Sequence, residues 1–107
     1  MTGAGELRHR LTLEQPVDTP DDAGGVLRSF APVGSLWAKV TAVSARDAIV
    51  ADASGATVTH RIVVRARAGL TTRHRLRNGG RTFSILALRE LGRDRAFIEI
   101  SAAERVA

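Results

Sequence analysis

Apolar and polar residues alternate along most of this chain, in short stretches that are separated by turn-forming residues. In the clearest stretch, residues 58–67, Val58, Ile62 and Val64 fall on one face, and Arg61 and Arg65 fall on the other. A period of two is that of a β-strand with one buried face. The pattern predicts seven strands, at residues 7–15, 26–31, 36–43, 58–67, 73–77, 81–88 and 96–102.

The breaks between these stretches contain residues that favour turns. Residues 16–25 read PVDTPDDAGG, and their prolines, aspartates and glycines predict a long mobile loop of functional importance. Pro32 and Gly34 are expected to end the second strand. Asn78-Gly79-Gly80 predicts a tight hairpin, because Asn and Gly tolerate positive φ.

One short segment is compatible with a helix. Ser44 is a suitable N-cap with Asp47 at the capping-box position, residues 45–53 can follow as a helix, and Gly55 is a plausible stop. The expected fold class is therefore all-β: a small β-barrel or sandwich of about seven strands, with one short helix inserted between strands three and four. The length predicts a single domain, residues 1–107.

Composition narrows the class of protein. Apolar residues make up 44% of the chain, which is typical of a globular protein, and the absence of cysteine excludes disulfides and cysteine-ligated zinc. Residues 1–10 are too polar for a signal peptide, and no apolar run approaches the ~20 residues that span a bilayer. We expect a soluble protein, made in the cytoplasm and not bound to membrane.

The sequence contains no recognisable catalytic motif. His9, His60 and His74 lack metal-ligand spacing, and there is no nucleophile elbow, Walker loop or dinucleotide fingerprint. His9 and His60 fall on apolar strand faces and are expected to be hydrogen-bonded core residues. The chain is therefore predicted to have no catalytic residue, no metal and no cofactor, and not to be an enzyme.

Positive charge is concentrated in one part of the chain. The net charge is +5, and Lys39 is the only lysine among the 16 basic residues, a ratio that a GC-rich genome would explain. No acidic residue occurs between Asp52 and Glu90. This asymmetry predicts a basic face directed toward DNA or toward an acidic partner. Its candidate residues are Arg61, Arg65, Arg67, Arg73, Arg75, Arg77 and Arg81.

Two further sets of residues are candidates for contacts between proteins. In the predicted loop they are Asp18, Asp21, Asp22, Gly24 and Gly25, which could form a gate or a subunit interface. Trp37 is the single tryptophan, for which a packing role is preferred to that of an exposed interface anchor.

Several blocks of the sequence, in order, resemble the phage head-tail joining, or head-tail adaptor, family. They are LRHRLTLEQP at 7–16, DDAGG at 21–25, LWAKV at 36–40, SARD at 44–47, THRI at 59–62 and GRTFSI at 80–85. Ala23 stands where an aromatic residue is frequent in the family, and Ala45 and Asp47 replace the usual Gly and Glu.

The resemblance implies a structural role in the neck of a tailed phage, prophage or gene transfer agent particle. Such proteins form a six- or twelve-fold ring of copies below the portal and adaptor, continue and close the DNA channel, and offer a surface to the tail-terminator or tail protein. Double-stranded DNA would pass through the lumen without sequence-specific contacts. The alternatives are a small basic nucleic-acid-binding β-barrel and a tail-terminator protein of the same particle.

Overall fold

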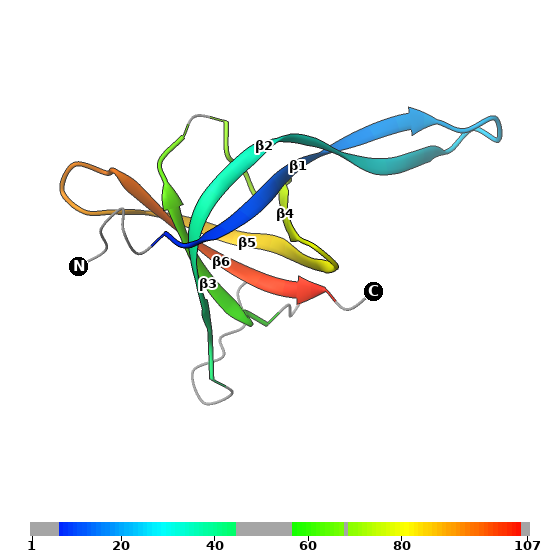
Figure 1. The fold of residues 1–107 in the computed structure, drawn as a ribbon. Helices are drawn as coiled ribbons and strands as arrows, with labels where there is room; N and C mark the ends of the chain where they lie inside the picture. The colour runs from blue at the N-terminus through cyan, green and yellow to red at the C-terminus, as the bar shows by residue number, and fades with distance from the viewer. Residues whose placement is uncertain (1–6, 45–56, 68, 106–107) are drawn as a thin grey trace.

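The computed structural model describes residues 7–44, 57–67 and 69–105, which contain six β-strands and no helix (Figure 1). The strands are β1 (His9–Pro20), β2 (Val26–Ala42), β3 (His60–Arg65), β4 (Arg75–Asn78), β5 (Arg81–Leu91) and β6 (Phe97–Arg105). The all-β prediction is confirmed. The helix predicted at residues 45–53 lies outside the described residues.

The six strands close on themselves in the order β1-β2-β3-β6-β5-β4, as a closed barrel. All neighbours are antiparallel, and closure comes from β4, whose residues 75–77 pair with residues 12–14 of β1. The Asn78-Gly79-Gly80 hairpin is confirmed, since Asn78 pairs with Arg81 and Gly79 has a φ of 60°. Closure leaves no free edge along the barrel itself, which protects these short strands from pairing with other chains.

The core lies inside the barrel and is made by alternate residues of every strand. Its largest fully buried side chains are Phe83, Leu11, Leu13, Ile62, Leu76, Ile100 and Val64. Full burial of a side chain of this size contributes about 1.5–3 kcal/mol relative to an exposed position. The aliphatic character of the core follows from the composition, because the chain has only four aromatic rings apart from histidine.

The prediction of seven strands is wrong because Pro32 and Gly34 do not end a strand. Predicted strands 26–31 and 36–43 are one continuous strand, β2, with a bulge at Val33. The bulge is visible in the register, which passes from Leu13 opposite Gly34 to Glu14 opposite Pro32. A bulge absorbs one extra residue and bends the strand without ending it.

The loop predicted at residues 16–25 is also largely a strand. Residues 16–20 continue β1 and pair with residues 26–30 of β2, so that only residues 21–25 form the connecting turn. The long mobile loop is therefore replaced by an extended two-stranded hairpin. Figure 1 shows this hairpin projecting beyond the barrel on the side opposite the β5–β6 turn.

A second bulge changes the phase of β5. Ile85 pairs with Ala102 but Ala87 pairs with Ser101, which leaves Leu86 without a direct partner. Alternation alone predicts Ala87 to share the inward face with Phe83 and Ile85. Beyond the bulge Ala87 is exposed instead, and Leu88 packs against the core.

Candidate assembly interface

The most prominent feature of the surface is the projecting part of the β1–β2 hairpin, residues 15–31, which we call the arm. It accounts for much of the 51 Å long axis of a molecule whose other two dimensions are 31 and 26 Å (Figure 1). Within the described residues, β3 joins β2 only from Ala38, and β4 contacts β1 only up to Glu14. Both edges of the arm are thus free of strand partners, and an isolated two-stranded hairpin is only marginally stable in water.

The prolines of the arm are compatible with strand structure because their nitrogens point outward. The Asp21 N–H donates to the Gly25 carbonyl at 3.0 Å, so this pair is hydrogen-bonded and the next pair, Pro20 and Val26, is not. By the same alternation Pro16 and Pro32 occupy positions whose N–H groups would point away from the hairpin. The outer edge of β1 consequently offers one N–H, from Asp18, where a regular strand would offer three.

Replacing Pro16 and Pro20 together by valine should make the chain self-associate. The change restores two outward N–H donors on β1, and two intermolecular hydrogen bonds of about 1 kcal/mol each would lower the concentration needed for association by roughly tenfold or more. Sedimentation velocity over a concentration series measures this effect. Thr19→Val is the matched control, since it adds a β-branched apolar side chain without opening the edge. Equal behaviour of the double variant and this control would contradict the blocked-edge argument.

The two faces of the arm differ in charge. One face continues the outer surface of the barrel and carries the Asp18–Arg28 pair together with Phe30. The other face continues the core side of β1 and β2 and has no charged residue. Its members are Gln15, Val17, Thr19, Leu27, Ser29 and Ala31. Depletion of charge is characteristic of the central part of a protein interface.

The aspartates of the arm have different roles. Asp18 accepts two hydrogen bonds from Arg28, at 2.8 and 3.2 Å, and this pairing holds the pKa of Asp18 below its usual value. Asp21 builds the turn, because its Oδ1 accepts the N–H groups of Ala23 and Gly25 at 2.9 and 2.7 Å. Gly24 supplies the positive φ, 82°, that the turn requires. Of the three aspartates, Asp22 is the one exposed at the tip without such a contact.

The structure divides the predicted basic face, because carboxylates from other strands pair with several of its arginines. Arg61 lies 3.4 Å from Glu99, Arg75 lies 2.6 Å from Glu14, and Arg81 lies 2.9 Å from Glu104. Arg77 is a weaker second partner of Glu14, at 3.9 Å. Among the described residues, the arginines of this set without a carboxylate within 4.0 Å are Arg65, Arg67 and Arg73.

The acidic partners are the residues that sequence reasoning missed. Glu14, Glu99 and Glu104 lie outside the acid-free window, and only the barrel closure and the β3–β6–β5 order bring them beside it. Local sequence contains no signal for these pairings, since the paired residues are between 23 and 61 positions apart. The three arginines without such partners remain candidates for contact with DNA or an acidic protein.

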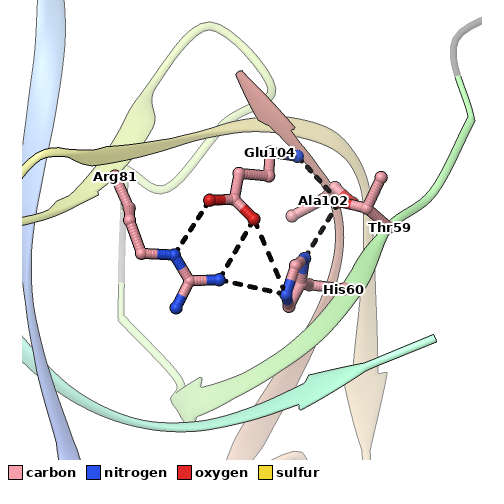
Figure 2. Close-up of polar contacts among 5 residues, drawn as sticks. All are labelled: Thr59, His60, Arg81, Ala102 and Glu104. Atoms are coloured by element: carbon pink, nitrogen blue, oxygen red, sulfur yellow. Dashed lines mark hydrogen bonds and ion pairs between the residues drawn. The ribbon is translucent and has the colours of Figure 1, made fainter. Parts of the chain in front are cut away.

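A polar network around His60 connects β3, β5 and β6 (Figure 2). Glu104 binds Arg81 through both oxygens, at 2.9 and 3.1 Å, and the Thr59 hydroxyl accepts the Glu104 N–H at 2.7 Å. Arg81 donates to His60 Nε2 at 3.3 Å, so neutral His60 protonated on Nδ1 satisfies the network by donating to Thr59 at 2.9 Å.

The electrostatics of this network agree with a structural role. Burial lowers the pKa of His60 and outweighs the opposite influence of Glu104, while the hydrogen bonds from Arg81 lower the pKa of Glu104. His60 is part-buried, edge-on to Phe83 with ring centroids 5.1 Å apart, as expected of a hydrogen-bonded core histidine. The same expectation is wrong for His9, which is exposed near the start of β1.

Trp37 is on the surface and is not part of the core, so a role in packing at the barrel rim or as an interface anchor stays a prediction. Its exposed fraction is 56%, and its cross-strand neighbour Arg10 lies over the ring at 5.8 Å from the centroid. The other exposed large apolar side chains of the described chain are also on β1 and β2: Val17, Val26, Leu27 and Val33. Concentration of such side chains on one hairpin identifies the hairpin as the candidate assembly surface.

A groove of about 530 Å³ lies at the base of the arm. Phe30 forms its arm side, the segment Thr72–Arg75 and residues of β5 form its walls, and Arg105 closes it at the end of β6. Arg75 connects the groove to the arm, since its guanidinium stacks on Phe30 at 3.8 Å while its Nε donates to Glu14. Among the groove residues of the described chain there is no acidic side chain.

The described residues contain no group of three His, Cys, Asp or Glu side chains that could hold a metal ion. No helix within the described residues is long and apolar enough to cross a membrane. The described surface presents an arm with one charge-free face, and cations beside the arm.

Comparison with known proteins gives a family and several similar structures, two of which are described below. The model of the family described as phage head completion protein matches residues 3–105. A chain from the virion of a native gene transfer agent particle is 32% identical, with a TM-score of 0.69 over 94% of this chain and 97% of that one. Protein SF1141 from Shigella flexneri 2a is 30% identical, with a TM-score of 0.71 and 96% of each chain covered. No curated protein matches.

Proposed function

The chain belongs to the phage head completion protein family, and we propose that it is a non-enzymatic structural protein that closes the head of a tailed-phage-like particle. Copies would form a six- or twelve-fold ring below the portal and adaptor, continue the DNA channel and present a surface to the tail-terminator or tail protein. The particle would be that of a phage, a prophage or a gene transfer agent. The observation that carries the proposal is the family match over nearly the whole chain.

The arm supports a role in assembly. An extended hairpin with exposed valine and leucine side chains gains stability when another protein covers it. The apolar patch on each copy is small, so a single contact would be weak. A preformed ring of adaptors would hold many copies together, and the weak contacts would then act jointly.

Deletion of the gene in its native host tests the proposal directly. We expect full-sized heads without tails, beside free tails and released DNA, in negative-stain images of the particles. Complementation with the unaltered gene is the control and should restore joined particles. Normal joined particles from the deletion strain would refute a role in head completion.

A nucleic-acid-binding module is the second candidate, and Arg65, Arg67 and Arg73 favour it because no carboxylate of the described residues lies within 4.0 Å of them. Binding through phosphates would weaken steeply as salt rises. Against this candidate, these arginines are not accompanied by a platform of aromatic side chains on which bases could stack, as in single-strand binders. A salt titration of DNA binding by the purified protein, together with the deletion strain, separates the candidates. Strong binding that weakens with salt, combined with normal particles in the deletion strain, would favour the module.

A further inference from the structure

The groove at the base of the arm combines apolar and cationic side chains. Phe30 and Leu86 supply apolar surface, and Arg73 and Arg105 supply positive charge. Arg75 also lines the groove, but Glu14 offsets its charge. A ligand that fits this groove would therefore carry apolar side chains together with at least one carboxylate.

The tip of the arm has this composition. Val26 and Leu27 are the most exposed large apolar side chains of the described chain, at 64% and 63%. Asp21 and Asp22 lie directly beside them in the turn, and Asp22 is exposed. The Asp18–Arg28 pair is neutral as a whole, so the two turn aspartates give the tip a net negative charge.

The tip cannot reach the groove of its own chain. Phe30, at the groove, and Gly24, in the turn, are six positions apart along a mostly extended segment, a distance of up to roughly 20 Å. The hairpin is straight enough in Figure 1 that its turn points away from the barrel. Two complementary surfaces at opposite ends of one rigid element can meet only between molecules.

We propose that the groove receives the arm tip of a second copy of this chain, with Val26 and Leu27 against Phe30 and Leu86, and Asp22 near Arg73. The contact is head-to-tail, since the tip and the groove are different surfaces. Such contacts close into rings when the rotation between copies permits. The inference rests on the proposed ring and specifies which parts of neighbouring copies touch.

Engineered cysteines test the contact within assembled particles. The chain has no cysteine of its own, so Asp22→Cys at the tip and Thr72→Cys at the groove rim introduce the only thiols. We expect particles that contain the double variant to yield, after mild oxidation, a ladder of covalent multimers on non-reducing gels. Asp22→Cys with Arg93→Cys is the matched control, because Arg93 lies in the β5–β6 turn on the opposite side of the barrel, and it should remain monomeric.

Three results would overturn the inference. Joined particles that contain the double variant only as monomer would exclude this contact while leaving the head-completion role intact. Dimers from the Asp22→Cys single variant would show a symmetric tip-to-tip contact. Absence of the chain from joined particles would remove both the contact and the proposed function.

A charge-reversal pair provides a second measurement if the cysteine variants assemble poorly. Arg73→Glu should reduce the yield of joined particles by about tenfold, the effect of about 1.4 kcal/mol. Adding Asp22→Arg should restore most of that yield, and Arg93→Glu should leave it unchanged. Failure of Asp22→Arg to rescue, together with weaker DNA binding by the purified Arg73→Glu protein, would assign the groove to DNA and overturn the proposal.

Discussion

Replacing residues 18–28 by Asn-Gly should leave a folded protein that no longer completes heads. The replacement joins Val17 to Ser29, a directly opposed pair at which a two-residue turn can close the hairpin. It keeps Phe30 and the Arg75 stack at the base of the arm, and it removes Val26, Leu27 and the turn. Since the core lies inside the barrel, we expect the melting temperature to change by only a few degrees.

The expected loss is in particle yield. Without the arm tip, each copy loses its most exposed apolar side chains, and every contact in a ring is lost at once. Because multivalent assembly multiplies small differences in each contact, complementation of a deletion strain should fall by at least about a hundredfold. The measurement is the number of tailed, DNA-filled particles by electron microscopy, with circular dichroism of the purified variant as the test of folding.

A control of matched length tests whether the chemistry of the arm matters or only its reach. Val26→Ser with Leu27→Ser keeps the hairpin and changes the tip alone. This variant should lose most of the yield that the shortened arm loses. Full activity of the shortened arm in a folded protein would contradict any role of the arm in assembly.

The parts of the fold that sequence predicted are those that local alternation encodes. Residues 58–67 alternate except at Val63, and β3 lies within that range. The turn between Asn78 and Arg81 is made by Gly79 and Gly80, and Gly79 supplies its positive φ of 60°. In both cases neighbouring residues along the chain contain the whole signal, so no tertiary information is needed.

Prediction from the sequence failed where the structural role of a residue depends on a partner that is distant along the chain. Proline and glycine ordinarily mark loops, yet Pro16, Pro20 and Pro32 lie in strands because the arm leaves their outward edges unpaired. The bulges at Val33 and Leu86 each shift the phase by one residue, and no local rule locates them. The arginine window seemed uniformly basic because its carboxylate partners are far away in sequence.

The residues predicted for an interface lie near one another in the structure, and their role in contacts between proteins stays a prediction. Asp18, Asp21, Asp22, Gly24 and Gly25 were selected for an interface, and the structure places all of them at the end of the arm. The exposed Val26 and Leu27 were assigned instead to an ordinary strand, because alternation cannot show which face of a strand lacks a cover. Only the position of the hairpin beyond the barrel identifies them as unpartnered.

Glu14→Ala should destabilise the protein more than removal of any exposed carboxylate. The Glu14 side chain is 6% exposed and receives Arg75 Nε at 2.6 Å, with Arg77 at 3.9 Å. Removing one partner of a buried ion pair leaves the other uncompensated, which costs 3–5 kcal/mol when both are buried. Because Arg75 is 30% exposed and can regain water, we expect a loss of about 2–3 kcal/mol in the free energy of unfolding.

Chemical denaturation of the variant beside Glu90→Ala measures this loss. Glu90 also pairs with an arginine, Arg95, but its side chain is 59% exposed, so its removal should cost about 0.5 kcal/mol or less. Equal stability of the two variants would show that burial adds nothing to the Glu14 pair.

The loss of Glu14 should also affect the base of the arm, because Arg75 contacts both the Glu14 carboxylate and the Phe30 ring. Arg75→Ala removes the charge pair and the stack together, so its cost should exceed that of Glu14→Ala if the stack contributes by itself. A double-mutant cycle between Glu14 and Arg75 separates the two contributions. If Glu14 and Arg75 show no coupling energy, the barrel fixes the base of the arm without this pair. Strong coupling between them would mean that barrel closure sets the direction of the arm through Glu14.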